Sequence, residues 1–197
     1  MSLKDKEKWD AKYLKKPQLL VPRDASVHLQ KYIDKVKKGK ALDLACGSGR
    51  NTLFLAQNGF EVDAQDIAQI ALDALNTQLK AENLSNLVDT KLIDLDSFSQ
   101  TNDNYNLILM CNFLDRKLLE KTKQSLNVGG IFIVETYMFD DKNEKEYSDK
   151  KNLLEKNELK DIFYDDYEIL FYDEYNNEPH EIYQMKKQVI VAKKRNK

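Results

Sequence analysis

The chain of 197 residues is poor in the residues that build disulfide scaffolds and metal sites, with two Cys, two His and three Pro. Two cysteines, Cys46 and Cys111, give no disulfide framework, and the isolated His28 and His180 lack metal-ligand spacing. We expect His28 to be an ordinary surface or packed side chain. No apolar run approaches the roughly 20 residues of a membrane span, and the N-terminus lacks the apolar core of a secretory signal. We therefore expect a cytoplasmic protein with no metal and no membrane partner.

Charge of one sign does not dominate either, because the formal net charge is −2. The charge is unevenly placed: residues 1–40 carry 12 basic and 5 acidic side chains, whereas residues 139–181 carry 6 and 15. Residues 182–197 add six Lys or Arg and no acid. Basic ends can indicate nucleic-acid binding, but no aromatic or groove-reading motif accompanies them, so solvated helix faces explain them better. We expect no nucleic-acid partner.

Glycine is scarce too, and all six glycines lie between positions 39 and 130, where short apolar runs alternate with helical stripes. The runs predict strands at 41–45, 60–64, 88–93, 105–111 and 131–135. The stripes predict helices at 29–36, 53–58, 68–79 and 118–126, the first capped by Ser26 and ended by Gly39, the last ended by Gly129 and Gly130. This alternation predicts a parallel sheet with helices on both faces.

The last third of the chain differs in character. Segment 139–151 is almost wholly charged and predicts a surface loop, which a short helix near 158–163 follows. Two further apolar runs, 167–172 and 188–192, predict an antiparallel hairpin with a long loop. No internal repeat or low-complexity tract interrupts the chain, so we expect a single domain, 1–197.

A strand that ends in a glycine turn and opens a helix is a ready site for an adenine nucleotide. Gly47 and Gly49 follow the strand at 41–45, and their lack of a side chain lets the backbone approach a ligand. The helix N-terminus behind them offers free N–H groups to an anionic group. Asp66 lies 19 positions after Gly47, at the end of the second strand, where a carboxylate can hold ribose hydroxyls. These residues predict a ligand that contains a ribose.

Two positions favour a methyl donor over a dinucleotide. Thr52 stands where the dinucleotide fingerprint needs its third glycine, which disfavours an NAD-dependent oxidoreductase. Asp94 follows the third strand, where its carboxylate could hold the exocyclic amine of an adenine. Two alternatives stay open: an NAD-dependent oxidoreductase, and a non-catalytic protein that binds S-adenosylmethionine.

The block Leu42-Asp-Leu-Ala-Cys-Gly-Ser-Gly-Arg-Asn51 resembles the first motif of class I S-adenosylmethionine-dependent methyltransferases, in the form found in their tellurite-resistance-type subgroup. The similarity continues in five further segments, 8–13, 60–72, 112–116, 129–136 and 188–193. The resemblance implies a Rossmann-like, seven-stranded, mostly parallel sheet with helices on both faces and an antiparallel last strand. It also implies S-adenosyl-L-methionine as cofactor, S-adenosyl-L-homocysteine as product and a small-molecule methyl acceptor.

Carried over position by position, the resemblance also implies which residues bind the cofactor. Asp43, Gly47 and Gly49 would surround the methionine part, and the cofactor-binding residues of the same turn would include Ala45, Cys46 and Arg50. Asp66 would hold the ribose, and the adenine would be contacted by Ile67, Asp94 and Leu95. The floor of the site, at the end of the fourth strand, would be formed by Cys111 and Asn112. Trp9 and Tyr13, in segment 1–25 near the cleft, would either cover the sulfonium or pack a helix. The chain departs from the general motif at Ala45, where glycine is usual, and at Asn106, where an acid often stands.

The acceptor side has three candidate catalytic residues. Arg116 could bind an anionic acceptor, while Glu135 and Tyr137 end the fifth strand, Tyr137 as wall rather than base. Transfer from a sulfonium depends mainly on alignment, and no residue pattern indicates an obligatory base. This favours a small acceptor that is already nucleophilic, such as a tellurite- or selenite-like oxyanion or a thiol. Cys46 and Cys111 would end adjacent strands as inert thiols, and no pattern indicates an oligomeric state.

Overall fold

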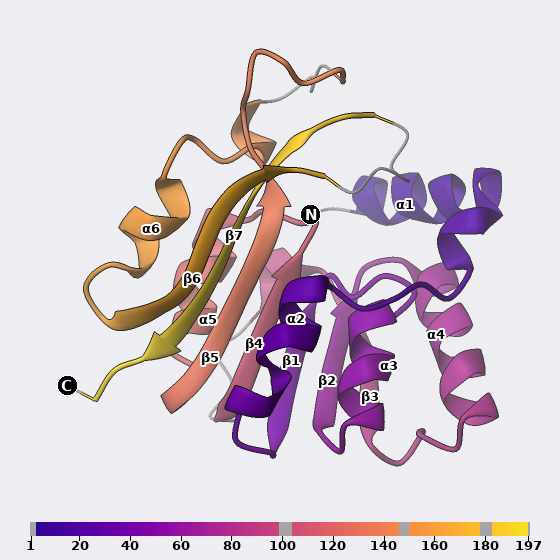
Figure 1. The fold of residues 1–197 in the computed structure, drawn as a ribbon. Coiled ribbons are helices and arrows are strands. Elements are labelled where there is room, and N and C mark those ends of the chain that lie inside the picture. The colour runs from indigo at the N-terminus through magenta and orange to yellow at the C-terminus, as the bar shows by residue number, and fades with distance from the viewer. Residues whose placement is uncertain (1–2, 99–103, 146–149, 178–182, 197) are drawn as a thin grey trace.

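Seven strands form one sheet in the order β3-β2-β1-β4-β5-β7-β6 (Figure 1). The computed structural model describes residues 3–98, 104–145, 150–177 and 183–196. The strands are β1 Lys40–Leu44, β2 Glu61–Asp66, β3 Val88–Leu92, β4 Tyr105–Cys111, β5 Leu126–Tyr137, β6 Tyr167–Asn176 and β7 Lys186–Lys194. Strands β1 to β5 pair in parallel, and β7 pairs antiparallel with both β5 and β6. The predicted architecture is therefore confirmed, including the antiparallel hairpin.

Helices cover both faces of this sheet. They are α1 Leu3–Lys15, α2 Val27–Tyr32, α3 Arg50–Gln57, α4 Gln69–Ala81, α5 Arg116–Lys123 and α6 Glu158–Phe163. Four short 3-10 turns add η1 Pro17–Leu20, η2 Ile33–Lys35, η3 Leu95–Ser97 and η4 Lys150–Asn152. One apolar cluster packs α2, α3 and α4 on one face, and a second packs η3, α5 and α6 on the other. Alternate residues of each strand serve the two clusters, as a doubly covered sheet requires.

Gly129 and Gly130 do not end a helix, so that prediction was wrong. Helix α5 ends at Lys123, and both glycines lie inside β5. The pairing register with β4 shifts there: Tyr105 pairs with Leu126, but Leu107 pairs with Ile131, which marks an irregularity in β5. Gly129 has φ +77°, and a Cβ at Gly130 would lie 2.9 Å from a backbone oxygen. Glycine is needed here for a bulge in a strand, a use that sequence spacing did not distinguish from a helix end.

Gly39 is also not the end of its helix, since α2 ends at Tyr32 and η2 carries the chain on. A Cβ at Gly39 would lie 2.6 Å from Asn106 Nδ2, so the glycine makes room for that side chain. Asn106 Nδ2 lies within hydrogen-bonding distance of the carbonyls of Lys37 and Lys38 and thereby fastens this loop to β4. The departure at Asn106 thus has a structural role.

Of the predicted charged loop 139–151, residues 146–149 lie outside the described residues. The described part leaves β5 after Tyr137 and returns at a parallel bridge between Met138 and Leu154. Among the described residues, no helix is both long enough and apolar enough to cross a membrane. The same ranges contain no group of three or more His, Cys, Asp and Glu side chains that could hold a metal ion.

Candidate cofactor and acceptor site

The turn after β1 is held in left-handed backbone conformations. Ala45, Gly47 and Gly49 have φ of +54°, +57° and +84°. A Cβ at Gly49 would lie 2.2 Å from Leu75 Cδ1, so this glycine also lets the turn pack against α4. Ala45 takes a conformation that disfavours residues with a Cβ, which explains why glycine is usual at this position of the motif. The turn is therefore a strained, closely packed backbone bend of the kind found at ligand sites.

Asp43 lies beneath this bend and is only 1% exposed. Its Oδ2 accepts a hydrogen bond of 2.6 Å from Thr52 Oγ1. Thr52, which stands where the dinucleotide fingerprint has its third glycine, therefore fixes the Asp43 carboxylate. Burial raises the pKa of Asp43 to about 6, against the opposing effects of Thr52 and the nearby Arg50 charge. A buried carboxylate of this kind can hold a cationic ligand group such as an α-ammonium.

Asp66 ends β2 directly beside the bend, as the sequence predicted. Its Oδ2 accepts from Gly47 N and its Oδ1 from Ala68 N, both at 2.8 Å. Burial raises the pKa of Asp66, although these backbone bonds favour the charged form. A carboxylate offers about four lone-pair sites, so these backbone bonds do not exhaust the acceptor capacity of Asp66.

The residues expected at the adenine lie in different environments. Ile93 N donates to Asp66 O, which places the turn after β3 next to the end of β2. Asp94 caps η3 there, and its Oδ1 accepts from Asp96 N. Ile67 is 7% exposed, and Leu95, at 2%, packs in the cluster beneath α5. Asp94 therefore lies in the turn beside the end of β2, whereas Leu95 mainly builds the core.

Arg50 opens α3 immediately after the bend. Its Nη2 is buried and has no hydrogen-bond partner among the described residues. Its positive charge acts on Asp43 and on Cys111, so it lies between the ends of β1 and β4. A buried guanidinium nitrogen without an acceptor is costly unless a ligand supplies one, and a carboxylate is the group it binds best. This orphaned donor fits the carboxylate of an amino-acid tail.

Helix α1 lies across the carboxyl end of the β1–β2 half of the sheet (Figure 1). Asp10 Oδ1 accepts from Ile70 N at the start of α4, and Ser48 Oγ donates to Leu19 O beyond the helix. The Tyr13 hydroxyl lies 3.0 Å from the position of a Cβ at Gly47, so Tyr13 covers the bend. Burial and the Asp66 charge raise the pKa of Tyr13, which keeps its hydroxyl protonated.

Trp9, the other predicted aromatic, packs one turn away with its ring centroid 6.3 Å from that of Tyr13. Lys12 Nζ lies 4.0 Å from the centre of the Trp9 ring. Trp9 therefore takes part in a contact within α1, whereas Tyr13 reaches the bend.

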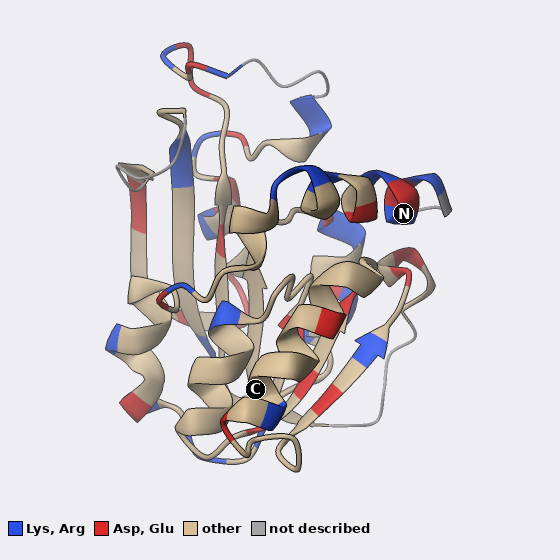
Figure 2. Cartoon of the chain, turned by 90° about the vertical axis from the view of Figure 1, so that its right-hand side faces the viewer, with Lys and Arg blue, Asp and Glu red and all other residues tan. Residues whose placement is uncertain are grey.

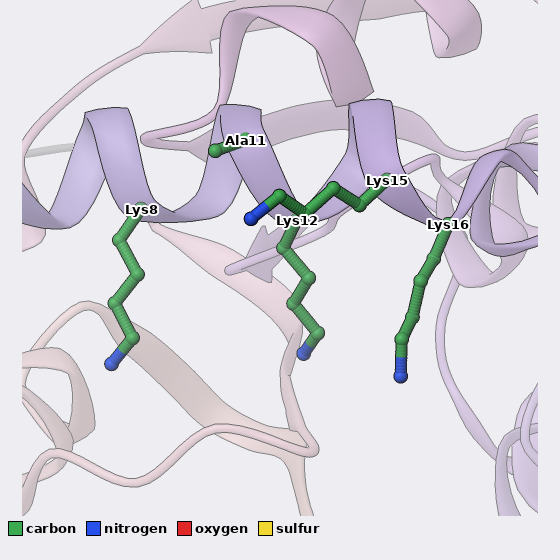
Figure 3. Close-up of a pocket in the computed structure, with 5 residues that line it drawn as sticks. All are labelled: Lys8, Ala11, Lys12, Lys15 and Lys16. Carbon is green, nitrogen blue, oxygen red and sulfur yellow. The ribbon is translucent and has the colours of Figure 1, made fainter.

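Basic residues recur along α1 in Figure 2, where blue segments alternate with a few acidic ones. A shallow cavity of about 320 Å³ lies beside the helix, lined by Lys8, Ala11, Lys12, Lys15 and Lys16. Figure 3 shows Lys8, Lys12 and Lys16 extending from the same side of α1. Partial burial, together with the charges of neighbouring lysines, lowers the pKa of Lys12. This basic cavity is separate from the glycine bend.

Cys46 and Cys111 are both free and half-buried, and both pack against the cluster beneath α2. Burial raises the pKa of each thiol, with Asp43 adding to the effect at Cys46 and Glu135 at Cys111. Both are therefore neutral thiols at neutral pH, as expected of unreactive cysteines. Asn112, the residue after β4, has φ +56°, which turns the chain at the end of that strand.

Glu135 is the centre of a network that the sequence did not reveal. The side chain is 1% exposed, and its Oε2 accepts from Ser26 Oγ at 2.6 Å and lies 3.0 Å from His28 Nδ1. Burial alone would raise the pKa of Glu135, but these bonds and the Lys187 charge outweigh it and lower the pKa to about 2. Oε1 is buried with no hydrogen-bond partner among the described residues.

Lys187 extends this network across the sheet. It is 0% exposed and pairs with Tyr137 on β5 and with Tyr175 on β6, so the three side chains share one face. Its Nζ lies 4.9 Å from the centre of the Tyr137 ring. Tyr137 thus packs beside a buried cation.

His28 and Phe171 connect α2 to β6. The two rings stack with centroids 5.4 Å apart. Ser26 caps α2 as predicted, but the sequence gave no sign that its hydroxyl also reaches β5. The sequence did not reveal that Ser26 and His28 contact Glu135, because these contacts span 109 and 107 positions.

Arg116 does not face this network. Its guanidinium pairs with both oxygens of Glu158 and donates to the carbonyls of Lys151 and Leu153. The pair raises the pKa of Arg116 and lowers that of Glu158. This arrangement gives Arg116 a structural role, fastening the segment before α6, and lends no support to an acceptor-binding role.

Comparison with known proteins agrees with this geometry. A family model described as "Tellurite resistance protein TehB" matches residues 3–191. A curated relative from Haemophilus influenzae, named probable S-adenosyl-L-methionine-dependent methyltransferase TehB, is 32% identical over 148 residues, which are 72% of this chain and 50% of the relative.

Solved structures share the fold. The crystal structure of TehB from Haemophilus influenzae matches with a TM-score of 0.76 at 27% identity, covering 87% of this chain and 63% of that one. A SAM-dependent methyltransferase from Methanosarcina mazei has a TM-score of 0.69 at 18% identity, covering 89% and 100%, which shows the fold alone. The chain spans about half the length of the curated relative it matches. The family match over nearly the whole chain shows that this protein belongs to the TehB family.

Proposed function

We propose that this chain is an S-adenosyl-L-methionine-dependent methyltransferase that acts on a small molecule. The observation that carries the proposal is the bend after β1, where a buried carboxylate, an orphaned guanidinium nitrogen and left-handed backbone come together beside Asp66. The printed name of the curated relative supports the same cofactor.

The chain's residues fit the parts of that cofactor in order along the sheet edge. Arg50 Nη2 would bind the carboxylate of the methionine tail, and Asp43 would hold its ammonium group. Asp66 would accept from the ribose hydroxyls, and Asp94 would accept from the adenine amine. Tyr13 would have to shift aside or lie against the ligand, since it covers Gly47.

Bound S-adenosyl-L-methionine would supply a methyl group on a sulfonium. The chain's contribution is then alignment: fixing an acceptor against that group can contribute on the order of 7–11 kcal/mol of the barrier. The fixed bend and the ends of β4 and β5 give such rigidity. The family description names tellurite resistance, which is in line with an oxyanion acceptor such as tellurite. The sequence also favoured a selenite-like oxyanion or a thiol.

Ligand binding tests the proposal directly. We expect S-adenosylmethionine and S-adenosylhomocysteine to raise the melting temperature and NAD to leave it unchanged. Asp66→Asn should weaken S-adenosylhomocysteine binding roughly tenfold or more, because a charged acceptor of hydrogen bonds is lost. Asp63→Asn is the matched control, since Asp63 is a buried carboxylate of the same strand that accepts from Tyr105 at the other end.

Two results would contradict the proposal. Stabilisation by NAD instead of S-adenosylhomocysteine favours the oxidoreductase alternative. Stabilisation by S-adenosylhomocysteine, with no methyl transfer to any of a broad panel of acceptors, favours a binding protein without catalysis.

A further inference from the structure

The cavity beside α1 is lined almost wholly by lysines. Lys8, Lys12, Lys15 and Lys16 line a space of about 320 Å³ together with Ala11. A spacing of four residues places Lys8, Lys12 and Lys16 on one side of the helix, because the bond from Lys16 N to Lys12 O continues the turn beyond α1. In Figure 3 the side chains of these three lysines point the same way. Several ammonium groups therefore share one side of α1.

The cavity lysines have no ion-pair partner among the described residues. Asp10, an acid of the same helix, is engaged elsewhere, since its carboxylate pairs with Lys6 and accepts from Ile70 N. Like charges four residues apart on a helix repel each other. Burial lowers the pKa of Lys12, and the charges of other lysines lower it further. The cavity therefore holds positive charge that a bound anion would balance.

A second segment adds to this charge. Lys145 lies in the segment after β5, and among the charges that lower the pKa of Lys12 its effect is the largest. Glu144 N donates to Gln184 O, and Gln184 N donates to Glu144 Oε2, so this segment is fastened to the chain before β7. The Glu144 carboxylate next to Lys145 is thus occupied by a backbone amide. The positive charge at the cavity comes from two elements of the fold, which distinguishes it from the solvated helix face that the sequence favoured.

The size and lining of the cavity favour a small oxyanion over a larger anion. Its volume is at the lower end of the range for small-molecule sites. Among the described residues, the lining includes no aromatic side chain on which a base could stack, which argues against a nucleic acid. Each lysine ammonium carries three rotatable donors and binds phosphate-like groups as a point charge. Neighbours one turn apart have Cβ atoms about 5–6 Å from each other, so their long side chains can converge on one anion.

We propose that the cavity beside α1 is a binding site for a small oxyanion of the phosphate or selenite type, held by Lys12 with its neighbours Lys8 and Lys16. The same helix carries Tyr13, which covers Gly47, so the bound anion would lie on the helix that covers the cofactor bend. Two sources would supply such an anion. One is free inorganic phosphate, and the other is an oxyanion acceptor of the proposed function, which would collect here before it enters the crevice.

Titration of the full chain without cofactor tests the inference. Selenite and phosphate are added separately while backbone amide and lysine side-chain chemical shifts are followed, with chloride at the same ionic strength as the reference. We expect both oxyanions to shift the signals of residues 8–16 and of Lys145 saturably, and chloride not to do so. Tighter binding of selenite would identify the acceptor as the source of the anion. Equal or tighter binding of phosphate would identify free phosphate.

A matched pair of double variants assigns the binding to these lysines. Lys8→Gln combined with Lys12→Gln should weaken oxyanion binding roughly tenfold, because charge-assisted hydrogen bonds are lost. Lys31→Gln combined with Lys35→Gln is the control, since these lysines are also four residues apart but lie on α2 and η2, outside the cavity. The control should leave the affinity unchanged.

Two results would overturn the inference. Shifts that do not saturate, or that chloride reproduces at the same ionic strength, would mean that the lysines are only a solvated helix face, and this titration of the wild type is decisive even if a variant does not fold. Equal affinity in the wild type and in the variant of Lys8 and Lys12 would contradict the assignment to these side chains. No cofactor is present, so neither result bears on the proposed function, which its own melting-temperature test decides.

Discussion

The two halves of the sheet edge are built by different means. On the β1–β2 side the polar groups are mostly backbone, in a bend with three left-handed residues, one of which, Gly47, donates its amide to Asp66. On the β5–β7 side they are side chains, Glu135 and Lys187, fixed by partners from α2 and β6. A backbone site suits a ligand shared by a family, because it depends on chain geometry. A side-chain site can vary between members, which suits an acceptor that differs among them.

The largest effect should come from filling the bend. Gly49→Ala would place a Cβ 2.2 Å from Leu75 Cδ1 on backbone with φ +84°. Left-handed strain and overpacking together should destabilise the fold by roughly 2 to 5 kcal/mol, measured by urea unfolding. Gly59→Ala is the matched control, because it has φ +79° and nothing within 4 Å of the added Cβ. It should lose only about 1 kcal/mol. Equal losses of stability in the two variants would show that the close packing of Gly49 against Leu75 does not contribute to the effect.

The two halves should also respond to pH with opposite sign, beginning with Asp43. Its folded pKa of about 6 lies above the ordinary aspartate pKa of 3.8, so the folded state binds more protons between these two pH values. Stability from this group is present at low pH and is lost as pH rises through about 6, a change on the order of 3 kcal/mol. The stability of Asp43→Asn relative to wild type should therefore increase from pH 4 to pH 7, measured by urea unfolding.

Glu135 should show the reverse. Its folded pKa of about 2 lies below the ordinary glutamate pKa of 4.5, so its contribution to stability is present above pH 4.5 and is lost as pH falls toward 2. The loss is on the order of 3 kcal/mol. Glu135→Gln should thus be least stable relative to wild type near neutral pH and approach it on acidification. Parallel pH profiles for the Asp43 and Glu135 variants would show that the two carboxylates do not differ as described.

Arg116 separates structural from binding roles on the acceptor side. Arg116→Lys keeps the charge but loses the two-fold pairing with Glu158 and the bonds to two carbonyls. We expect a loss of roughly 1 to 2 kcal/mol, moderated by solvent at this partly exposed pair, and no change in S-adenosylhomocysteine affinity. An unchanged stability together with a raised KM for the acceptor would restore Arg116 as an acceptor-binding residue.

The backbone bend could be predicted from the sequence better than the side-chain contacts around Glu135. The mostly parallel sheet, the Ser26 cap and the position of Asp66 at the end of the second strand depend on local pattern or on fold rules, so they could be predicted. Gly129 was misassigned because the same residue type serves a helix end and a strand bulge. The link from His28 to Glu135 needs the folded sheet, since no local pattern joins residues 107 positions apart.

The smallest expected effect concerns the residue at which this chain departs from the general motif. Ala45 has φ +54°, where a Cβ is strained, so Ala45→Gly should stabilise the fold by about 1 kcal/mol despite glycine's greater freedom when unfolded. Ala74→Gly, within α4 at ordinary helical angles, should instead destabilise it by about 1 kcal/mol. The opposite signs of the same substitution, read from urea unfolding, would establish that the bend stores strain in its backbone. Losses in both variants would mean that the bend is relaxed around Ala45, and that the methyl group contributes packing that glycine cannot replace.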